Sequence, residues 1–184
     1  MDPEESLRGQ LLIASPALLD PNFARTVVLV VEHNDEGAMG VVLNRPTTAS
    51  VAEAVPALEE LVDDDEPIFA GGPVEPAAVV VLAEFDDTEA AAALVFGDLG
   101  FLRADADPSV LESAARRFRV FAGYAGWGEG QLEAELEQES WILEPAVPDD
   151  VFADDAEELW SSVLRRKGGQ YAVVALMPPD PSLN

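Results

Sequence analysis

Residues 20–46 read DPNFARTVVLVVEHNDEGAMGVVLNRP, and this stretch decides the fold of the chain. It contains two apolar runs rich in Val, residues 26–32 and 41–43, which are separated by Asn34-Asp35-Glu36-Gly37. A polar sequence that ends in Gly is typical of a reversing turn. The pattern therefore predicts two adjacent antiparallel strands. Because both runs are too apolar to face water on either side, we expect them at the middle of a sheet.

Polar side chains lie at both outer ends of this predicted hairpin. Asp20, Asn22 and Arg25 precede the first strand, and Asn44 and Arg45 follow the second. If the strands pair across the turn, both ends reach the same edge of the sheet, and the five side chains should lie near one another. Arg beside Asp and Asn can hold a carboxylate or phosphate through its planar guanidinium. The alternative is a network that satisfies the backbone of its own loops.

The length and charge of the chain set its broad class. With 184 residues it is long enough for a hydrophobic core, and we expect one domain over residues 1–184 with polar tails at about 1–8 and 178–184. The 36 acidic and ten basic residues give a net charge of −26. This charge repels phosphate backbones, so we expect no direct nucleic-acid binding. A solvated acidic coat explains the charge, and adaptation to salt is the alternative.

Other classes are excluded by what the sequence lacks. There is no Cys, which excludes disulfides, thiolate metal sites and thiol nucleophiles. His33 is the only histidine, so a multi-histidine metal site is excluded, and we expect neither a metal nor a cofactor. The first ten residues lack the pattern of a signal peptide, and no apolar run reaches the ~18 residues of a membrane span. We therefore expect a cytoplasmic protein without membrane contact.

The rest of the chain mixes strands and helices without strict βαβ alternation, which predicts an α+β fold. Residues 88–96 fit a helix or a strand, and the acidic residues 63–66 are expected to form a solvated connector. Arg116 and Arg117 fall in the last turn of one predicted helix, where positive charge suits the helix dipole. Strands are predicted over residues 10–15, 68–70, 78–84, 101–102, 120–124, 141–143 and 170–176, and helices over 51–61, 108–117, 131–138 and 154–166.

Two glycine-rich segments add candidate site residues. Gly71-Gly72-Pro73 predicts a turn that needs positive φ and allows close backbone approach. Residues 123–130 predict a loop between a strand and a helix, where backbone N–H groups can receive an anion. Their spacing is not G-x-G-x-x-G, so a tight turn with Trp127 as a core or rim anchor is favoured over a nucleotide site. Gln131, at the start of the next helix, would reach back to the hairpin or to a ligand.

Several longer motifs occur in a fixed order along the chain. They are LLIASPALLDPNF (residues 11–23), RTVV (25–28), His33 with GAMG (37–40), LNRP (43–46), GGPV (71–74), GYAGW (123–127), GQLE (130–133) and Trp141. Together they resemble the YqgE/AlgH family of small bacterial proteins. The resemblance implies a cytosolic α+β protein with a branched mixed or antiparallel sheet, partly curled into a small barrel and flanked by helices. Members are labelled putative transcriptional regulators without an established activity.

One departure from the family pattern bears on mechanism. The family often has His after the leucine of the AVVVLAE strand, where this chain has Ala83. A mechanism that needs two histidines is therefore in doubt here.

These observations give one leading expectation for function and one alternative. We expect a regulatory or interaction module that binds an unknown small ligand or a protein partner. The alternative is a small hydrolase or transferase that uses His33 as a general base or the Asp20/Arg25 cluster, although no Ser or Cys pairs with His33 by spacing. The candidate ligand-binding residues are Asp20, Asn22, Arg25, His33, Asn44, Arg45, Gly71, Gly72, Trp127 and Gln131.

Overall fold

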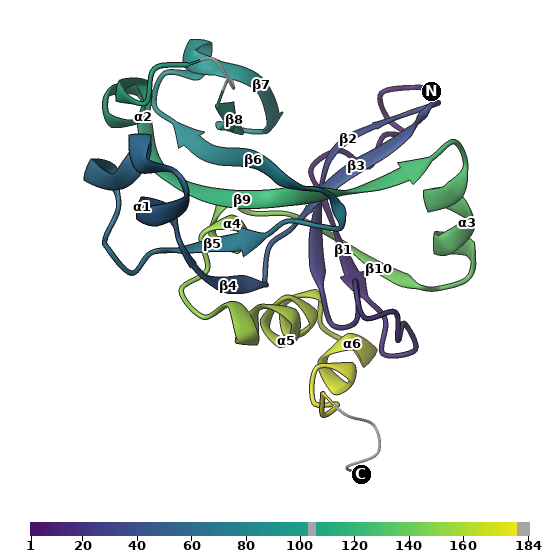
Figure 1. Ribbon diagram of the computed structural model, residues 1–184. Coiled ribbons are helices and arrows are strands. Elements are labelled where there is room, and N and C mark those ends of the chain that lie inside the picture. Colours follow the sequence, from purple (N-terminus) through teal and green to yellow (C-terminus); the bar gives the residue numbers. More distant parts are fainter. Residues whose placement is uncertain (103–105, 180–184) are drawn as a thin grey trace.

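The computed structural model describes residues 1–102 and 106–179, and it has the predicted α+β fold (Figure 1). A mostly antiparallel sheet curls into a half-barrel and is flanked by helices. In the described residues, no helix is long and apolar enough to cross a membrane. The strands are β1 Gln10–Ala14, β2 Val27–Asn34, β3 Gly37–Val42, β4 Pro46–Ser50, β5 Pro67–Ala70, β6 Val74–Phe85, β7 Ala91–Phe96, β8 Leu99–Leu102, β9 Ala115–Gly128 and β10 Trp141–Pro145. The helices are α1 Val51–Ala54, η1 Pro56–Leu61, η2 Thr88–Ala90, α2 Ser109–Ala114, α3 Gln131–Glu137, α4 Pro148–Val151, α5 Ala156–Lys167 and α6 Gln170–Val174.

The long strand β9 joins the two halves of the molecule. Its first part pairs with β6 and, in parallel, with β5, while its last residues pair with β3. In Figure 1 it crosses from the half that carries α1 and α2 to the half that carries α3. Because one strand divides its length among three partners, the sheet branches. The expected branched sheet is therefore present, and β9 holds it together.

The predicted hairpin is confirmed as β2 and β3. The strands pair antiparallel from Val28 opposite Val42 to Asn34 opposite Gly37, which leaves a two-residue turn. β2 lies between β1 and β3, as its apolar run predicts. Its side chains alternate between two cores, with Leu29 in one and Val28 in the other.

Helices cover both faces of this sheet. On one face α5 buries Trp160, Val163 and Leu164 against β1, β2 and β3, and Asp155 caps its start by accepting a hydrogen bond from the Glu158 N–H. On the other face Leu132 of α3 packs with the two buried tryptophans of the α3 end of the sheet. A third core fills the space between α1, η1, α2 and the half-barrel.

Two predicted segment assignments are wrong because strand pairing overrides local pattern. The predicted helix over residues 108–117 ends at Ala114, and Arg116 and Arg117 lie in β9 opposite β6, so they do not face a helix C-terminus. The predicted loop over residues 123–130 is also mostly strand, since β9 continues to Gly128 and pairs with β3.

The third wrong assignment is the last strand, predicted over residues 170–176. This segment forms the helix α6. Tyr171, Val174 and Ala175 pack on the main core. Their spacing of three and four residues is helical, and it outweighs the preference of adjacent Val residues for strands.

Candidate functional site

Asn44 ties together the outer ends of the hairpin. Its side-chain oxygen accepts a hydrogen bond from the Val27 N–H at 2.9 Å, and its amide donates to the Arg25 carbonyl oxygen at 2.9 Å. Both functions of the amide are thus used on the backbone of the neighbouring strand and loop. The structure brings the ends of β2 and β3 together, as their pairing predicts.

Arg45 completes this network on the loop before β2. Its guanidinium donates to the carbonyl oxygens of Asn22 and Ala24 at 2.8 and 3.1 Å. Burial lowers the pKa of Arg45, and the charge of Asp20 acts in the opposite direction. Asp20 itself accepts the Asn22 N–H at 2.9 Å. The hydrogen bonds that Asn44, Arg45 and Asp20 make here all go to loop backbone, as in the second of the two interpretations that the sequence left open.

The side chain of Arg25 lies outside the network of Asn44 and Arg45. Its guanidinium lies 4.0 Å from the ring centroid of Trp160 and donates to the Met177 carbonyl oxygen at 3.0 Å. Burial lowers its pKa, and Glu158 opposes this shift. Arg25 lines an apolar cavity of about 310 Å³ with residues such as Leu18. It anchors α5 and the segment after α6.

His33 is held by two hydrogen bonds. Its Nδ1 accepts the Leu7 N–H at 2.9 Å, and its Nε2 lies 2.7 Å from a carboxylate oxygen of Glu133. Because Nδ1 is an acceptor, the ring proton belongs on Nε2, which donates to Glu133. The side chain is 2% exposed. Neither ring nitrogen is left to take a proton from a substrate.

The N-terminal residues join this arrangement. The Ser6 hydroxyl donates to the His33 carbonyl oxygen, the Leu7 side chain packs on the core beneath α3, and the amino group of Met1 pairs with Asp35. Although this stretch was predicted as a polar tail, Met1, Ser6 and Leu7 contact the hairpin.

The hydrogen bond between His33 and Glu133 should give a small pH dependence of stability. The hydrogen bond from His33 lowers the pKa of Glu133. The ionised Glu133 therefore adds to the free energy of unfolding above the ordinary glutamate pKa of about 4.3, and this stabilisation is lost as pH falls through the lower pKa of the folded state. Since Glu133 is 46% exposed, we expect Glu133→Gln to cost less than about 1 kcal/mol at pH 7. Urea unfolding at pH 7 and pH 3.5 measures this cost, which should shrink at the lower pH. A cost that grows on acidification would contradict it.

Trp127 and Gln131 belong to a network centred on Glu135. One oxygen of this carboxylate accepts the Nε1–H groups of Trp127 and Trp141, at 2.7 and 2.9 Å, and the other accepts the Gln131 amide at 3.3 Å. Trp127 is 6% exposed and its ring packs with those of Phe23 and Trp141. Trp127 is therefore a core anchor, and it is not among the residues that line the cavity beside Arg25.

Gly71 and Gly72 bring two backbones into contact. The Gly71 N–H donates to the Ala122 carbonyl oxygen and its own carbonyl accepts the Val42 N–H, each at 2.8 Å. A Cβ on Gly72 would lie 2.1 Å from the Tyr124 carbonyl carbon. The close approach that the sequence predicted is therefore made to β9.

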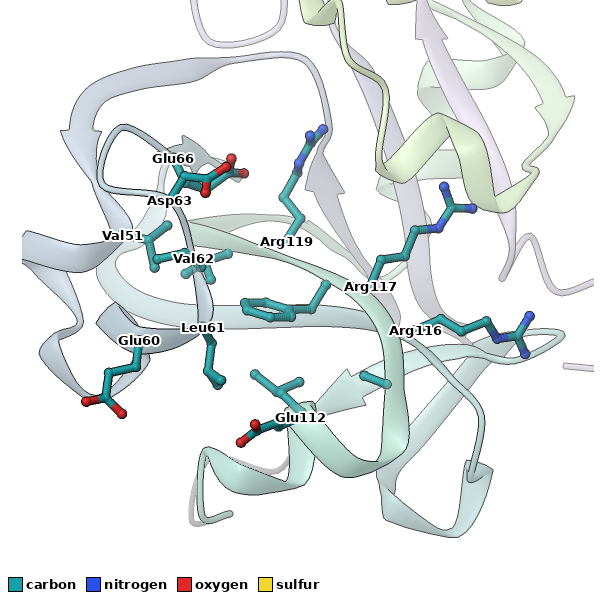
Figure 2. Close-up of a pocket in the computed structure, with 14 residues that line it drawn as sticks. Val51, Glu60, Leu61, Val62, Asp63, Glu66, Glu112, Arg116, Arg117 and Arg119 are labelled. Carbon is teal, nitrogen blue, oxygen red and sulfur yellow. The ribbon is translucent and has the colours of Figure 1, made fainter.

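A groove of about 560 Å³ lies away from these candidate residues, between the start of β9 and η1 with the loop that follows it (Figure 2). It is called the first groove below. Leu61, Phe118 and Val120 are among the apolar residues that line it. Figure 2 shows Asp63 and Glu66 on the loop near Arg119, while Glu60 and Glu112 lie at the other end. It thus combines an apolar floor with a charged rim. The lining residues are Val51, Glu60, Leu61, Val62, Asp63, Glu66, Leu111, Glu112, Ala115, Arg116, Arg117, Phe118, Arg119 and Val120.

Two of the three arginines beside this groove are neutralised by acids outside it. Arg117 pairs with Glu84 and Asp149, each at 2.8 Å. Arg116 pairs with Glu84 and also with Asp86 and Asp98 at 2.7 and 3.1 Å. These guanidinium groups are occupied within the protein. The arginine cluster is therefore not an open anion site.

Arg119 is bound differently. It donates to the carbonyl oxygens of Val151 and Ala153 at 3.2 and 3.0 Å, and its guanidinium lies 4.4 Å from the ring centroid of Phe69. Burial lowers its pKa, against the charges of Glu66 and Asp154. This side chain fixes the segment before α5 against the half-barrel, and it lines the first groove and a neighbouring one.

The sequence did not reveal this groove. Its acidic loop, residues 63–66, and its arginine strand, residues 115–120, lie about 50 positions apart in the chain. One local signal was present: Arg117 and Arg119 alternate with Phe118 and Val120, which is the period of a strand.

The chain matches the AlgH-like family over residues 11–172. A "UPF0301 protein" of Thermobifida fusca is 46% identical over 97% of this chain and 96% of its own length, and one of Streptomyces coelicolor is 44% identical over 100% and 98%. A crystal structure of a Corynebacterium diphtheriae protein aligns with a TM-score of 0.84 at 29% identity, covering 92% of this chain and 91% of that one. The solution structure of the AlgH protein from Pseudomonas aeruginosa aligns with a TM-score of 0.73 at 32% identity, covering 97% of each chain. These names assign no activity. The chain belongs to the AlgH-like family.

Proposed function

We propose that the chain is a regulatory interaction module that binds a protein partner in the bacterial cytoplasm through the first groove. The carrying observation is the groove itself, which is open and about 560 Å³ in volume and joins an apolar floor to a charged rim. Protein interfaces are built in this way, with apolar anchors in pockets and polar residues around them. Regulation through a protein partner also suits the net charge of −26, which disfavours DNA as the target.

The contacts of the other candidate residues favour binding over catalysis. Both ring nitrogens of His33 are engaged by Leu7 and Glu133. Asp20 and Arg45 serve the loop backbone. The alternative hydrolase or transferase would need one of these groups to be free to contact a substrate.

A small apolar ligand is the second candidate, because one further cavity favours it. This cavity measures about 600 Å³, and the residues that line it, such as Met39, Leu58, Val79 and Phe101, are all uncharged. Val79 is half exposed there. Binding of a hydrophobic fluorescent probe that is lost in Val79→Asp, with unfolding unchanged, would support this candidate.

Site-specific crosslinking tests the leading proposal. A photoreactive residue placed at Glu60, in the rim of the first groove, should crosslink in cells to a defined protein, and the same residue at Glu137 on α3 should not. The partner is then identified by mass spectrometry and purified. Its affinity should fall at least about tenfold for Glu60→Lys/Asp63→Lys, since reversal of two rim charges costs on the order of 1–2 kcal/mol.

The control pair Glu129→Lys/Glu137→Lys makes the same change in net charge at the α3 end of the molecule. It should leave the affinity nearly unchanged. Equal crosslinking from both positions, or a partner that binds the groove variant as well as the wild type, would overturn the proposal.

A further inference from the structure

We infer that the partner contributes an extended, basic segment with apolar side chains, which crosses the first groove and continues into a second one. This inference rests on the proposed function and specifies the chemistry of the partner. The second groove is a cavity of about 490 Å³ between β4, β5 and the start of α5, lined by Pro46, Glu66, Pro67, Phe69, Arg119, Asp154, Asp155, Ala156 and Glu157.

The two grooves adjoin. Glu66 and Arg119 line both of them, so the cavities lie on either side of this pair. Each groove has an aromatic side chain in its lining, Phe118 in the first and the largely buried Phe69 in the second. A single segment of chain that passes over Glu66 and Arg119 therefore reaches both cavities.

The charge of the walls selects the occupant. Seven acidic residues line the two grooves: Glu60, Asp63, Glu66, Glu112, Asp154, Asp155 and Glu157. Arg119 is the positive charge that offsets them, because Arg116 and Arg117 are paired with acids outside the grooves. Asp155 also accepts the Glu158 N–H as the cap of α5. The walls therefore carry an excess of negative charge, which a segment rich in Lys or Arg complements.

An extended conformation suits the alternation of floor and rim. Successive side chains of an extended strand point to opposite sides. Apolar side chains at every second position can then lie on the floor while basic side chains reach the acids of the rim. A segment that is basic but lacks apolar residues would leave the floor open to water.

Three synthetic peptides of twelve residues test the inference. The first alternates Lys with Leu, the second replaces each Lys with Glu, and the third replaces each Leu with Ser. Binding is measured by calorimetry at 150 mM NaCl, where charges more than about 8 Å apart are largely screened. The first peptide should bind at least about tenfold more tightly than either of the others.

Charge reversals locate the site. Glu60→Lys/Asp63→Lys changes the first groove, Asp154→Lys/Glu157→Lys changes the second, and Glu129→Lys/Glu137→Lys is the control. Each groove pair should weaken binding of the first peptide about tenfold, and the control about twofold or less. Thermal unfolding of each variant establishes that the fold is kept.

Every other outcome overturns the inference. Equal weakening by the control pair means attraction to the whole acidic surface, and an effect from only one groove means that no segment spans both. Preference for the Glu peptide makes Arg119 the recognition element. If the partner crosslinked from Glu60 still requires the first groove while the peptides fail, the proposed function stands and only the basic segment is rejected.

Discussion

Gly72→Ala should destabilise the protein severely. The φ of Gly72 is +153°, and a Cβ there would lie 2.1 Å from the Tyr124 carbonyl carbon and 2.2 Å from its oxygen. Neither obstacle is a flexible side chain, so β5 and β6 would have to move away from β9. Overpacking costs about 1–3 kcal/mol where side chains yield, and the backbone conformation adds about 1 kcal/mol. We expect a loss of more than about 4 kcal/mol, a large share of the stability of a domain this size.

Gly97→Ala is the matched control. Gly97 also has a positive φ, +51°, but a Cβ added there in the β7–β8 turn would meet nothing within 4 Å. It should cost about 1 kcal/mol. Guanidinium unfolding followed by circular dichroism compares the stability of the two variants. In the same measurement the wild type should unfold in one transition if residues 1–184 form one domain, as we propose. A Gly72→Ala protein as stable as Gly97→Ala would show that the two backbones are not packed this closely.

The features that the sequence predicted correctly are local ones. The two Val-rich apolar runs and the polar turn between them defined β2 and β3, and the helix predicted over residues 154–166 is present as α5. The helix predicted over residues 51–61 is also present, capped by Ser50 and divided at Pro56 into α1 and η1. Each of these signals acts within one turn or one strand.

The features that it missed depend on pairing between distant residues. Residues 115–117 have good helix propensity, yet they extend β9 because β6 offers a long partner strand. Gly126 and Gly128 were predicted to form a loop, whereas they lie opposite Met39 and Gly37 in β3. The local sequence of one strand does not show which distant strand will pair with it.

In the candidate site, too, local contacts were predicted and contacts between distant segments were missed. The hairpin ends do meet, and Asn44 and Arg45 connect them through backbone groups. The polar composition of this stretch indicated contact but could not distinguish a ligand site from a loop that satisfies itself, since both need the same donors and acceptors. The grooves on either side of Arg119 depend instead on the position of a loop about 50 residues earlier in the chain.

Glu135→Ala should destabilise the α3 end of the sheet by about 3 kcal/mol. The substitution removes the acceptor that Trp127 and Trp141 share and leaves two buried indole N–H groups without it. Each unpaired buried donor costs about 1–3 kcal/mol, and the partial exposure of Glu135 allows water to recover part of this. The loss should be measured by urea unfolding monitored through tryptophan fluorescence, because both rings report on this network.

Two variants separate the hydrogen bonds from other effects of the change. Glu135→Gln keeps one side-chain oxygen as an acceptor, so it should cost less than about half as much as Glu135→Ala. Glu137→Ala removes a carboxylate from the same helix at an exposed position and should be nearly neutral. If all three variants unfold at the same urea concentration, the indole N–H groups are satisfied without Glu135. If only Glu135→Ala is strongly destabilised, this carboxylate is what fixes Trp127 as a structural residue, and α3 is attached to the sheet through it.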